Sequence, residues 1–331
     1  MTVDADVTTD EAVAAPKPAS TRKTTIVTWL RRLLLLVVVA GAAWTLTKHW
    51  PTVWATTKTL PWGSVLLSEL AVIVGIAFGV LAWRTIVKDI GPPVGYVRCA
   101  QINLVGSLGK YVPGSVWAYL LQMELARKAG VGRARIVTGS LVQVGLALVA
   151  TAGFATAALP SLYGEFPGAI FFAIALPVGV CALHPRILTW AMNRILKLIR
   201  RQPLEAPLHF RMIGEALGLQ VVSYAFFGLH LWILADAVGA APGLAGFLLC
   251  TAAVTIGLNA GMFVFVLPSG AGIRDGMIVA VLISSLAYPQ ALAFALVSRV
   301  MFVVADLVTA GAAAWLARWR VPIRPAAPRE P

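Results

Sequence analysis

Two short segments interrupt the apolar stretches of this sequence with glycine, proline and a cation. Residues 106–117 read GSLGKYVPGSVW and contain Lys110, and residues 267–276 read LPSGAGIRDG and contain Arg274. A helix that breaks inside a membrane leaves backbone N–H groups without partners, and such groups bind anions. A lysine, an arginine and free N–H groups at membrane depth predict a site for a phosphate, and a lipid headgroup is the natural phosphate there.

A structural interpretation of these two segments stays open beside the anion site. Proline and glycine can simply kink helices, and both cations can extend to the cytosolic interface on their long side chains. Secondary transporters often place helix breaks at matching positions in the two halves of the chain, around a central site. One break lies in each half here, but the halves share little beyond Pro-Gly-Ser against Pro-Ser-Gly, which only suggests a repeat.

Other ionisable residues fall in apolar segments, where a charge needs a partner or a function. Arg299 and Asp306 are seven residues apart on one predicted helix, so they share a face without touching directly. These two residues pair either with each other or with residues of other helices. Their role is then either structural or functional. Glu69, Glu215 and Asp236 are further candidates, with Asp236 expected at the outer interface.

Several classes of function are disfavoured by the residue pattern. The net charge of +13 does not indicate nucleic-acid binding, because the basic residues cluster between apolar runs, as they do in membrane proteins. The 3 cysteines and 4 histidines are scattered without ligand spacing, so we predict no metal and no cofactor. The GSLGKY segment is not a nucleotide-binding phosphate loop, because Tyr111 stands where serine or threonine is needed.

The composition indicates which elements must position these residues. The chain has 331 residues, of which 59% are hydrophobic and 12% charged, against about 45–50% and roughly 25% in soluble proteins. About 20 apolar residues cross a bilayer. The apolar segments are the run after Arg31 and Arg32, 62–83, 136–158, 168–184, 212–236, 244–267, 274–287 and 290–316. They predict an all-α integral membrane protein with about eight transmembrane helices and two broken or re-entrant segments, the first within residues 99–126. The segments 168–184 and 274–287 are short, and a segment of 14 residues barely crosses the membrane or is re-entrant.

The charges predict the orientation of this membrane protein. Most of the 27 lysines and arginines lie at the N-terminus, at 84–98, 127–135 and 186–211, and at the C-terminus. Eight spans with both termini in the cytosol put all of these on one side of the cell membrane. Residues 1–25 are then a disordered cytosolic tail, 26–318 the membrane domain and 319–331 a short basic tail. The stretch 185–211 is partly amphipathic, and it lies on the anionic inner leaflet or simply connects two spans.

The two broken segments resemble the lysylphosphatidylglycerol synthase transmembrane region family, a flippase-like membrane domain. The residues that carry the resemblance are Gly109 to Trp117, Leu267 to Gly276, and Ser298 and Arg299 with Asp306 after them. It covers roughly residues 30–318, and it departs from the family at Asp275, where members often have glutamate. The resemblance implies a polytopic fold with re-entrant segments. In larger members this membrane part moves aminoacylated phosphatidylglycerol between leaflets, and a separate soluble domain makes that lipid.

The resulting expectation is a lipid translocase without enzymatic activity. The sequence ends at Pro331 without a soluble synthase domain, so we do not expect aminoacyl transfer. The substrate would be an anionic phospholipid or a polyprenyl-phosphate glycolipid. The predicted substrate-binding residues are Lys110, Tyr111, Pro113, Gly114, Ser115, Pro268, Gly270, Gly272, Arg274, Asp275, Arg299 and Asp306. Lys110 and Arg274 would meet the phosphate, while Asp275, Arg299 and Asp306 would orient them or form a gate.

Two alternatives come from other classes of protein. One is a membrane transferase that uses a lipid-linked donor, for which Asp275 and Glu124 are the candidate bases. The other is a scaffold for a cell-envelope glycolipid complex, with a glycosyltransferase or a lipid synthase as its partner. We predict no catalytic residue for the leading hypothesis.

Overall fold

The computed structural model describes residues 51, 54–55, 58–111, 116–162, 166, 168–198, 202–204, 206–264 and 268–320. The chain divides into residues 1–41 and 42–331, and all described residues belong to the second unit. The predicted N-terminal tail and the apolar run after Arg31 and Arg32 lie outside the described residues. The same holds for residues 321–331 of the predicted C-terminal tail, whereas 319 and 320 still belong to the last helix.

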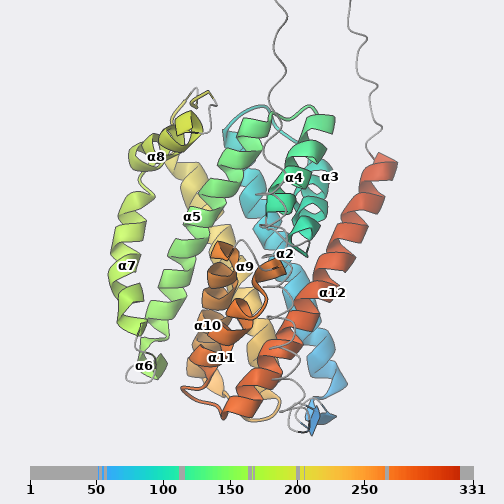
Figure 1. Ribbon diagram of the computed structural model, residues 1–331, viewed down its shortest axis with the longest axis vertical. Coiled ribbons are helices and arrows are strands. Elements are labelled where there is room, and N and C mark those ends of the chain that lie inside the picture. Colours follow the sequence, from blue (N-terminus) through green and yellow to red (C-terminus); the bar gives the residue numbers. More distant parts are fainter. Residues whose placement is uncertain are drawn as a thin grey trace, which may run out of the picture. The chain divides into compact units, whose positions relative to one another are not determined.

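The described part of the chain is entirely helical, without strands. Five helices are long and apolar enough to cross a membrane, or six if one bent helix pair counts as a span. The five are α2 (Trp62–Asp89), α5 (Arg133–Ala157), α9 (Phe210–Asp236), α10 (Gly243–Phe263) and α12 (Tyr288–Arg320), shown in Figure 1. The prediction of an all-α membrane protein is thus confirmed, whereas the described residues contain five or six candidate spans and not the eight that were predicted for the whole chain.

The bent pair lies between α5 and α9, after the short α6 (Leu159–Leu162). It consists of α7 (Ala169–Ala182) and α8 (Pro185–Leu198), whose axes differ by 86°. One stripe of α8, formed by Leu188, Met192 and Leu196, is buried against the neighbouring helices. Packing against the protein covers this stripe, while Ile187, Trp190 and Leu198 of the same helix are exposed. Contact of this segment with the inner leaflet therefore stays a prediction.

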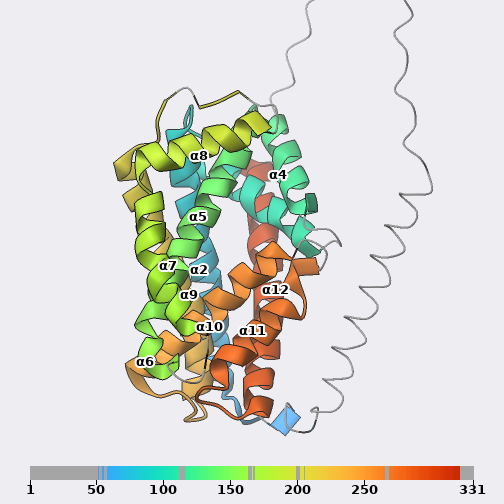
Figure 2. The same cartoon turned by 60° about the vertical axis from the view of Figure 1, so that its left-hand side comes forward.

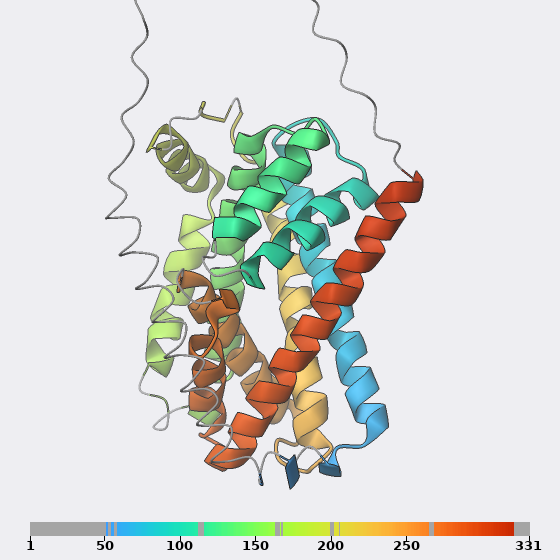
Figure 3. The same ribbon diagram turned by 45° about the vertical axis from the view of Figure 1, so that its right-hand side comes forward.

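The expected break within residues 99–126 is confirmed as a helical hairpin. It comprises α3 (Tyr96–Ala100), the π-helical turn η1 (Gln101–Val105), the 3₁₀ turn η2 (Leu108–Tyr111) and α4 (Val116–Lys128). Figures 1 and 3 show α3 and α4 at one end of the helix bundle, with η2 directed toward its middle. A Cβ on Gly109 would lie 2.5 Å from the backbone nitrogen of Ala118, so this close approach requires glycine. We call residues 96–128 the first hairpin.

A second hairpin, residues 243–282, enters from the opposite end of the bundle. It consists of α10, the 3₁₀ turn η3 (Pro268–Gly270) and α11 (Ile273–Leu282), and Figure 2 shows α11 returning beside α10. The 10 residues of α11 span about 15 Å, half of the roughly 30 Å hydrocarbon core. Of the two alternatives for the short segment 274–287, a full span and a re-entrant segment, the structure favours the second: its helix is the short return limb of a hairpin.

Glycines hold the two limbs of the second hairpin together. A Cβ on Gly257 would meet Ile278, and one on Gly261 would lie 3.3 Å from the Cα of Gly270. Gly270 itself has a φ of +64°, a conformation that side-chain-bearing residues rarely adopt. The hairpin thus depends on glycine both for its packing and for its turn.

Substituting Gly270 with alanine is expected to destabilise the second hairpin. The positive φ costs about 1–3 kcal/mol for a residue with a Cβ. The new methyl group would also collide with the Gly261 backbone, and overpacking costs typically about 1–3 kcal/mol. Thermal unfolding of the purified protein in detergent should show a midpoint several degrees below wild type.

The matched control for this substitution is Gly276→Ala on the adjacent helix α11. A Cβ at Gly276 meets no atom within 4 Å, and alanine is the better helix former. This variant should unfold at or above the wild-type midpoint. Equal midpoints for the two variants would contradict the role assigned to Gly270.

Candidate functional site

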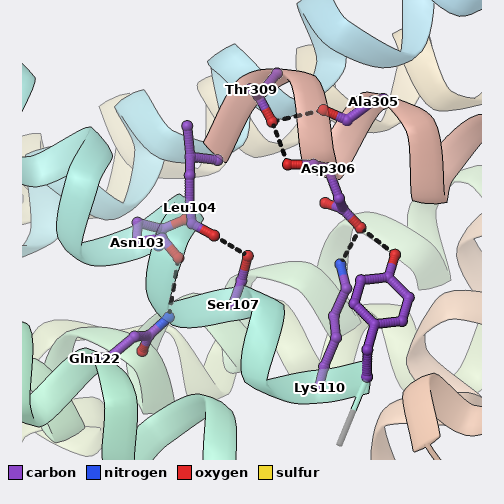
Figure 4. Close-up of polar contacts among 9 residues, drawn as sticks. Asn103, Leu104, Ser107, Lys110, Gln122, Ala305, Asp306 and Thr309 are labelled. Carbon is purple, nitrogen blue, oxygen red and sulfur yellow. Dashed lines mark hydrogen bonds and ion pairs between the residues drawn. The ribbon is translucent and has the colours of Figure 1, made fainter. Parts of the chain in front are cut away.

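The long helix α12 is bound to the first hairpin through one carboxylate. The Lys110 Nζ lies 2.6 Å from Asp306 Oδ2, and the Tyr111 hydroxyl donates a hydrogen bond of 2.6 Å to the same oxygen. Figure 4 shows Lys110 and Asp306 pointing toward each other across the gap between their elements. The Asp306 side chain is only 7% exposed, so this ion pair lies inside the helix bundle.

The same helix is bound to the second hairpin through a second ion pair. The Arg299 Nη1 lies 2.5 Å from Asp275 Oδ2, which also accepts a hydrogen bond of 3.2 Å from the Gly272 N–H. This contact caps the N-terminus of α11 with a negative charge, which the helix dipole favours. Arg299 and Asp306 thus pair with different hairpins rather than with each other.

Arg274 is the one site cation without a carboxylate partner within the described residues. Its side chain is buried, with 5% of the residue exposed, and its guanidinium lies 4.2 Å from the centre of the Phe302 ring. Its Nε and Nη2 atoms have no hydrogen-bond partner in the described part of the chain. A buried charge without a partner is costly, so this arginine is poised to receive an anion.

A cavity of about 340 Å³ lies between the two hairpins and helices α5 and α9. Lys110 of the first hairpin and Arg274 of the second both line it, together with Ser269 and Gly270 at the turn η3. The turns η2 and η3 also contact each other, although they enter from opposite ends of the bundle. The two sequence segments that predicted an anion site therefore meet at one cavity.

The other predicted site residues fall into three groups. Pro113, Gly114 and Ser115 lie outside the described residues. Pro268 begins the turn η3, but its side chain is not described. The residues Tyr111, Gly272, Asp275, Arg299 and Asp306 hold the hairpins and do not line the cavity.

The remaining ionisable candidates lie away from the cavity. Glu215, selected because it falls in an apolar segment, is exposed and pairs with Arg211 on its own helix rather than lying buried. Asp236 is exposed at the end of α9, and its place at the outer interface stays a prediction. Glu69 is partly buried on α2, and Glu124 pairs with Arg127 at the surface of α4.

Several cavity residues were not selected from the sequence. Gln143 lies on α5, Gln220 and Tyr224 on α9, and Asn103 on the turn η1. Each is a single polar residue in an apolar run, and a polar group at membrane depth is itself a signal of function. That signal alone does not show that these residues converge on one cavity.

A comparison of the sequence with models of known protein families indicates what kind of protein this is. Residues 32–310 match the model of the family described as the lysylphosphatidylglycerol synthase TM region. The chain belongs to this family. The match spans both hairpins and α12 as far as Asp306 and beyond, which confirms the resemblance seen in the motifs. The protein is therefore a multi-pass membrane protein of the flippase-like type. No curated protein matches the chain.

Proposed function

We propose that the protein moves an anionic lipid between the leaflets of the cell membrane without enzymatic chemistry. The lipid's phosphate would bind in the cavity between the two hairpins. The observation that carries this proposal is the buried, unpaired guanidinium of Arg274 beside Lys110 in that cavity. Membership of the flippase-like family supports it independently.

The arrangement of cations supports phosphate binding in two ways. Arginine presents a planar fork of donors that matches two phosphate oxygens, and charge-assisted hydrogen bonds of this kind are strong. Lys110 shares Asp306 with Tyr111, and its side chain remains 34% exposed. A phosphate in the cavity would thus receive two donors from Arg274 and compete with Asp306 for Lys110.

The two hairpins supply a route for alternating access. They enter from opposite ends of the bundle, and each is tied to α12 by its own ion pair. Transporters with broken helices typically move one such element against a scaffold around a fixed central site. Breaking the Lys110–Asp306 pair would release the first hairpin, and breaking the Arg299–Asp275 pair would release the second.

The positions of the basic helix ends support the predicted orientation. Lys88 in the last turn of α2, Lys128 in that of α4 and Lys197 in that of α8 all belong to the end of the bundle drawn uppermost in Figure 1. The positive-inside rule assigns this end to the cytosol. We take two of the eight proposed segments, α10 and α11, to enter and leave the membrane on the same side. An even number of crossings then remains, and the proposed cytosolic position of both termini is unchanged. A glycosyltransferase or lipid synthase would supply the lipid.

The test is headgroup movement in liposomes reconstituted with the full chain. Probes are phosphatidylglycerol and phosphatidylinositol with a fluorophore on one acyl chain, quenched from outside by dithionite. Wild type should move at least one probe faster than protein-free liposomes. The variant Lys110→Ala with Arg274→Ala should lose about tenfold or more of this rate, because each charged hydrogen bond contributes about 1.5–3 kcal/mol.

The matched control removes one lysine and one arginine from the surface. Lys128 and Arg211 are both exposed and pair only with carboxylates on their own helices within the described residues, so Lys128→Ala with Arg211→Ala should move lipid at the wild-type rate. Equal rates for wild type and the Lys110→Ala, Arg274→Ala variant would overturn the proposed site. Headgroup transfer that requires Mg²⁺ or Mn²⁺, without lipid movement, would favour the transferase instead.

A further inference from the structure

The cavity carries an unusual number of carboxamide side chains for a site inside a membrane. Five of its lining residues are amides, contributed by the first hairpin, α5, α9 and α10: Asn103, Gln122, Gln143, Gln220 and Asn259. Each primary amide offers two donors and one acceptor oxygen without a net charge. Since polar groups at membrane depth are expensive, this concentration needs an explanation beyond helix packing.

Some of these amide groups already form hydrogen bonds with other residues of the protein. The Asn259 Nδ2 donates to Thr151 Oγ1 at 2.7 Å and to the Thr255 carbonyl at 2.9 Å. The Gln143 Nε2 donates to the Gly79 carbonyl at 2.9 Å and to Gln220 Oε1 at 3.3 Å. These bonds hold the amides in place and fix which end of each faces the cavity.

Other polar groups of the cavity lining keep their hydrogen-bonding capacity. Within the described residues, the side-chain amide of Asn103 and the hydroxyl of Tyr119 make no hydrogen bond, and neither do the Gln220 Nε2 and the Gln143 Oε1. The cavity therefore presents uncharged donors and uncharged acceptors together. Hydroxyl groups, which donate and accept at once, complement such a surface.

The charge of the lining excludes one class of headgroup. No carboxylate of the described residues lines the cavity. The two nearby carboxylates are already paired, Asp275 with Arg299 and Asp306 with Lys110. Arg274 leaves one positive charge without a partner. An ammonium group, such as that of a lysyl-bearing lipid, would meet this charge with no acidic group to stabilise it.

We infer that the ligand is a phosphate that carries one neutral, polyhydroxylated ring, such as inositol or a single sugar. This inference rests on the proposed function and names the headgroup of the lipid that is moved. The phosphate binds Arg274, the ring hydroxyls bind the carboxamides, and the apolar face of the ring packs on Tyr224 or Phe227 in the cavity wall. The volume of about 340 Å³ is near the lower end of small-molecule sites, about 300–1,000 Å³, and so favours one ring over an oligosaccharide.

The test is a comparison of four probes by their effect on the unfolding midpoint of the full chain in detergent. The probes are phosphatidylinositol, phosphatidic acid, lysyl-phosphatidylglycerol and soluble inositol 1-phosphate. We expect phosphatidylinositol to bind at least tenfold more tightly than phosphatidic acid, and lysyl-phosphatidylglycerol to bind most weakly of the lipids. Inositol 1-phosphate should bind at least tenfold more weakly than phosphatidylinositol because it lacks the acyl chains.

The outcomes separate this inference from the proposed function. Equal binding of phosphatidylinositol and phosphatidic acid, or tighter binding of the lysyl lipid, would overturn the headgroup chemistry and leave lipid movement standing. If inositol 1-phosphate binds as tightly as the lipid, the headgroup chemistry holds and the ligand is a soluble phosphate, which overturns lipid transport. If no probe binds, both proposals fail.

Single substitutions locate the ring-binding groups. Gln220→Met and Asn103→Leu should each reduce the preference for phosphatidylinositol over phosphatidic acid by at least threefold while the affinity for phosphatidic acid stays unchanged. Gln143 keeps its bond to Gly79 in the first variant, so the packing of α5 against α2 is retained. The exposed amide of Gln290 at the start of α12 is the control, and Gln290→Met should keep the wild-type preference. A full preference in both cavity variants would contradict the assignment.

Discussion

Replacing Asp306 with asparagine is expected to stop lipid movement and to lower the stability of the protein. The substitution removes the only carboxylate that pairs with Lys110 within the described residues, while leaving the shape of the side chain nearly unchanged. Removing one partner of a buried ion pair costs about 3–5 kcal/mol, and the partial exposure of Lys110 places the cost near the lower limit. Thermal unfolding in detergent and the liposome assay measure the two effects.

A double-mutant cycle separates the ion pair from other effects of the substitution. Lys110→Met on the Asp306→Asn background removes the unpaired cation, so the double variant should be more stable than Asp306→Asn alone. It should still not move lipid, because Lys110 lines the cavity. Strictly additive losses of stability would show that Lys110 and Asp306 do not interact, contrary to their separation of 2.6 Å.

The hydroxyl of Tyr111 is the second group, after the Lys110 ammonium, that contacts Oδ2 of Asp306. Tyr111→Phe removes one hydrogen bond to Asp306 and leaves the ion pair in place. Its cost should be about 1.5–3 kcal/mol, the usual contribution of a hydrogen bond to a charged group. The difference between this variant and Asp306→Asn measures how much of the attachment between the first hairpin and α12 depends on charge.

The positions of the two breaks were predictable because their causes are local. Gly109 and Gly270 occupy positions where a Cβ would collide with the opposite limb, and glycine at such positions is visible in the sequence. For the apolar run 274–287, the sequence left open whether it crosses the membrane or is re-entrant, since hydropathy does not report where a helix stops. The Ser284 hydroxyl donates to the Val281 carbonyl at 2.8 Å just after α11 ends, and such local bonds compete with the helix.

The partners of the charged residues could not be predicted from the sequence. Spacing placed Arg299 and Asp306 on one face of a helix, which left open whether they pair with each other. Their partners Asp275 and Lys110 lie 24 and 196 residues away in the sequence, on two different hairpins. The carboxamides of the cavity were missed for a similar reason, because single residues on separate elements have no common spacing.

Replacing Arg274 with methionine is expected to change stability and function in opposite directions. The buried guanidinium has no carboxylate partner within the described residues, so exchanging it for an apolar side chain of similar length should stabilise the ligand-free protein by about 1–4 kcal/mol. A methionine sulfur can still contact the ring of Phe302, which now lies against the guanidinium. The same variant should lose the rise in unfolding midpoint that phosphatidylinositol produces in wild type.

A ligand-binding arginine differs from a structural one in the signs of these two effects, a gain in the stability of the free protein and a loss of lipid binding. An arginine that served only packing would lose stability on removal, because its contacts with Phe302 would be lost without any gain from removing an unpaired charge. Arg274→Lys is the control: it keeps the charge but not the fork of donors, so it should retain weak lipid binding and gain no stability. A methionine variant that unfolds below wild type, or that still responds to the lipid, would contradict the role of Arg274. If the expected result is obtained, the energetic cost of this arginine in the free protein is the reason that an anion binds there.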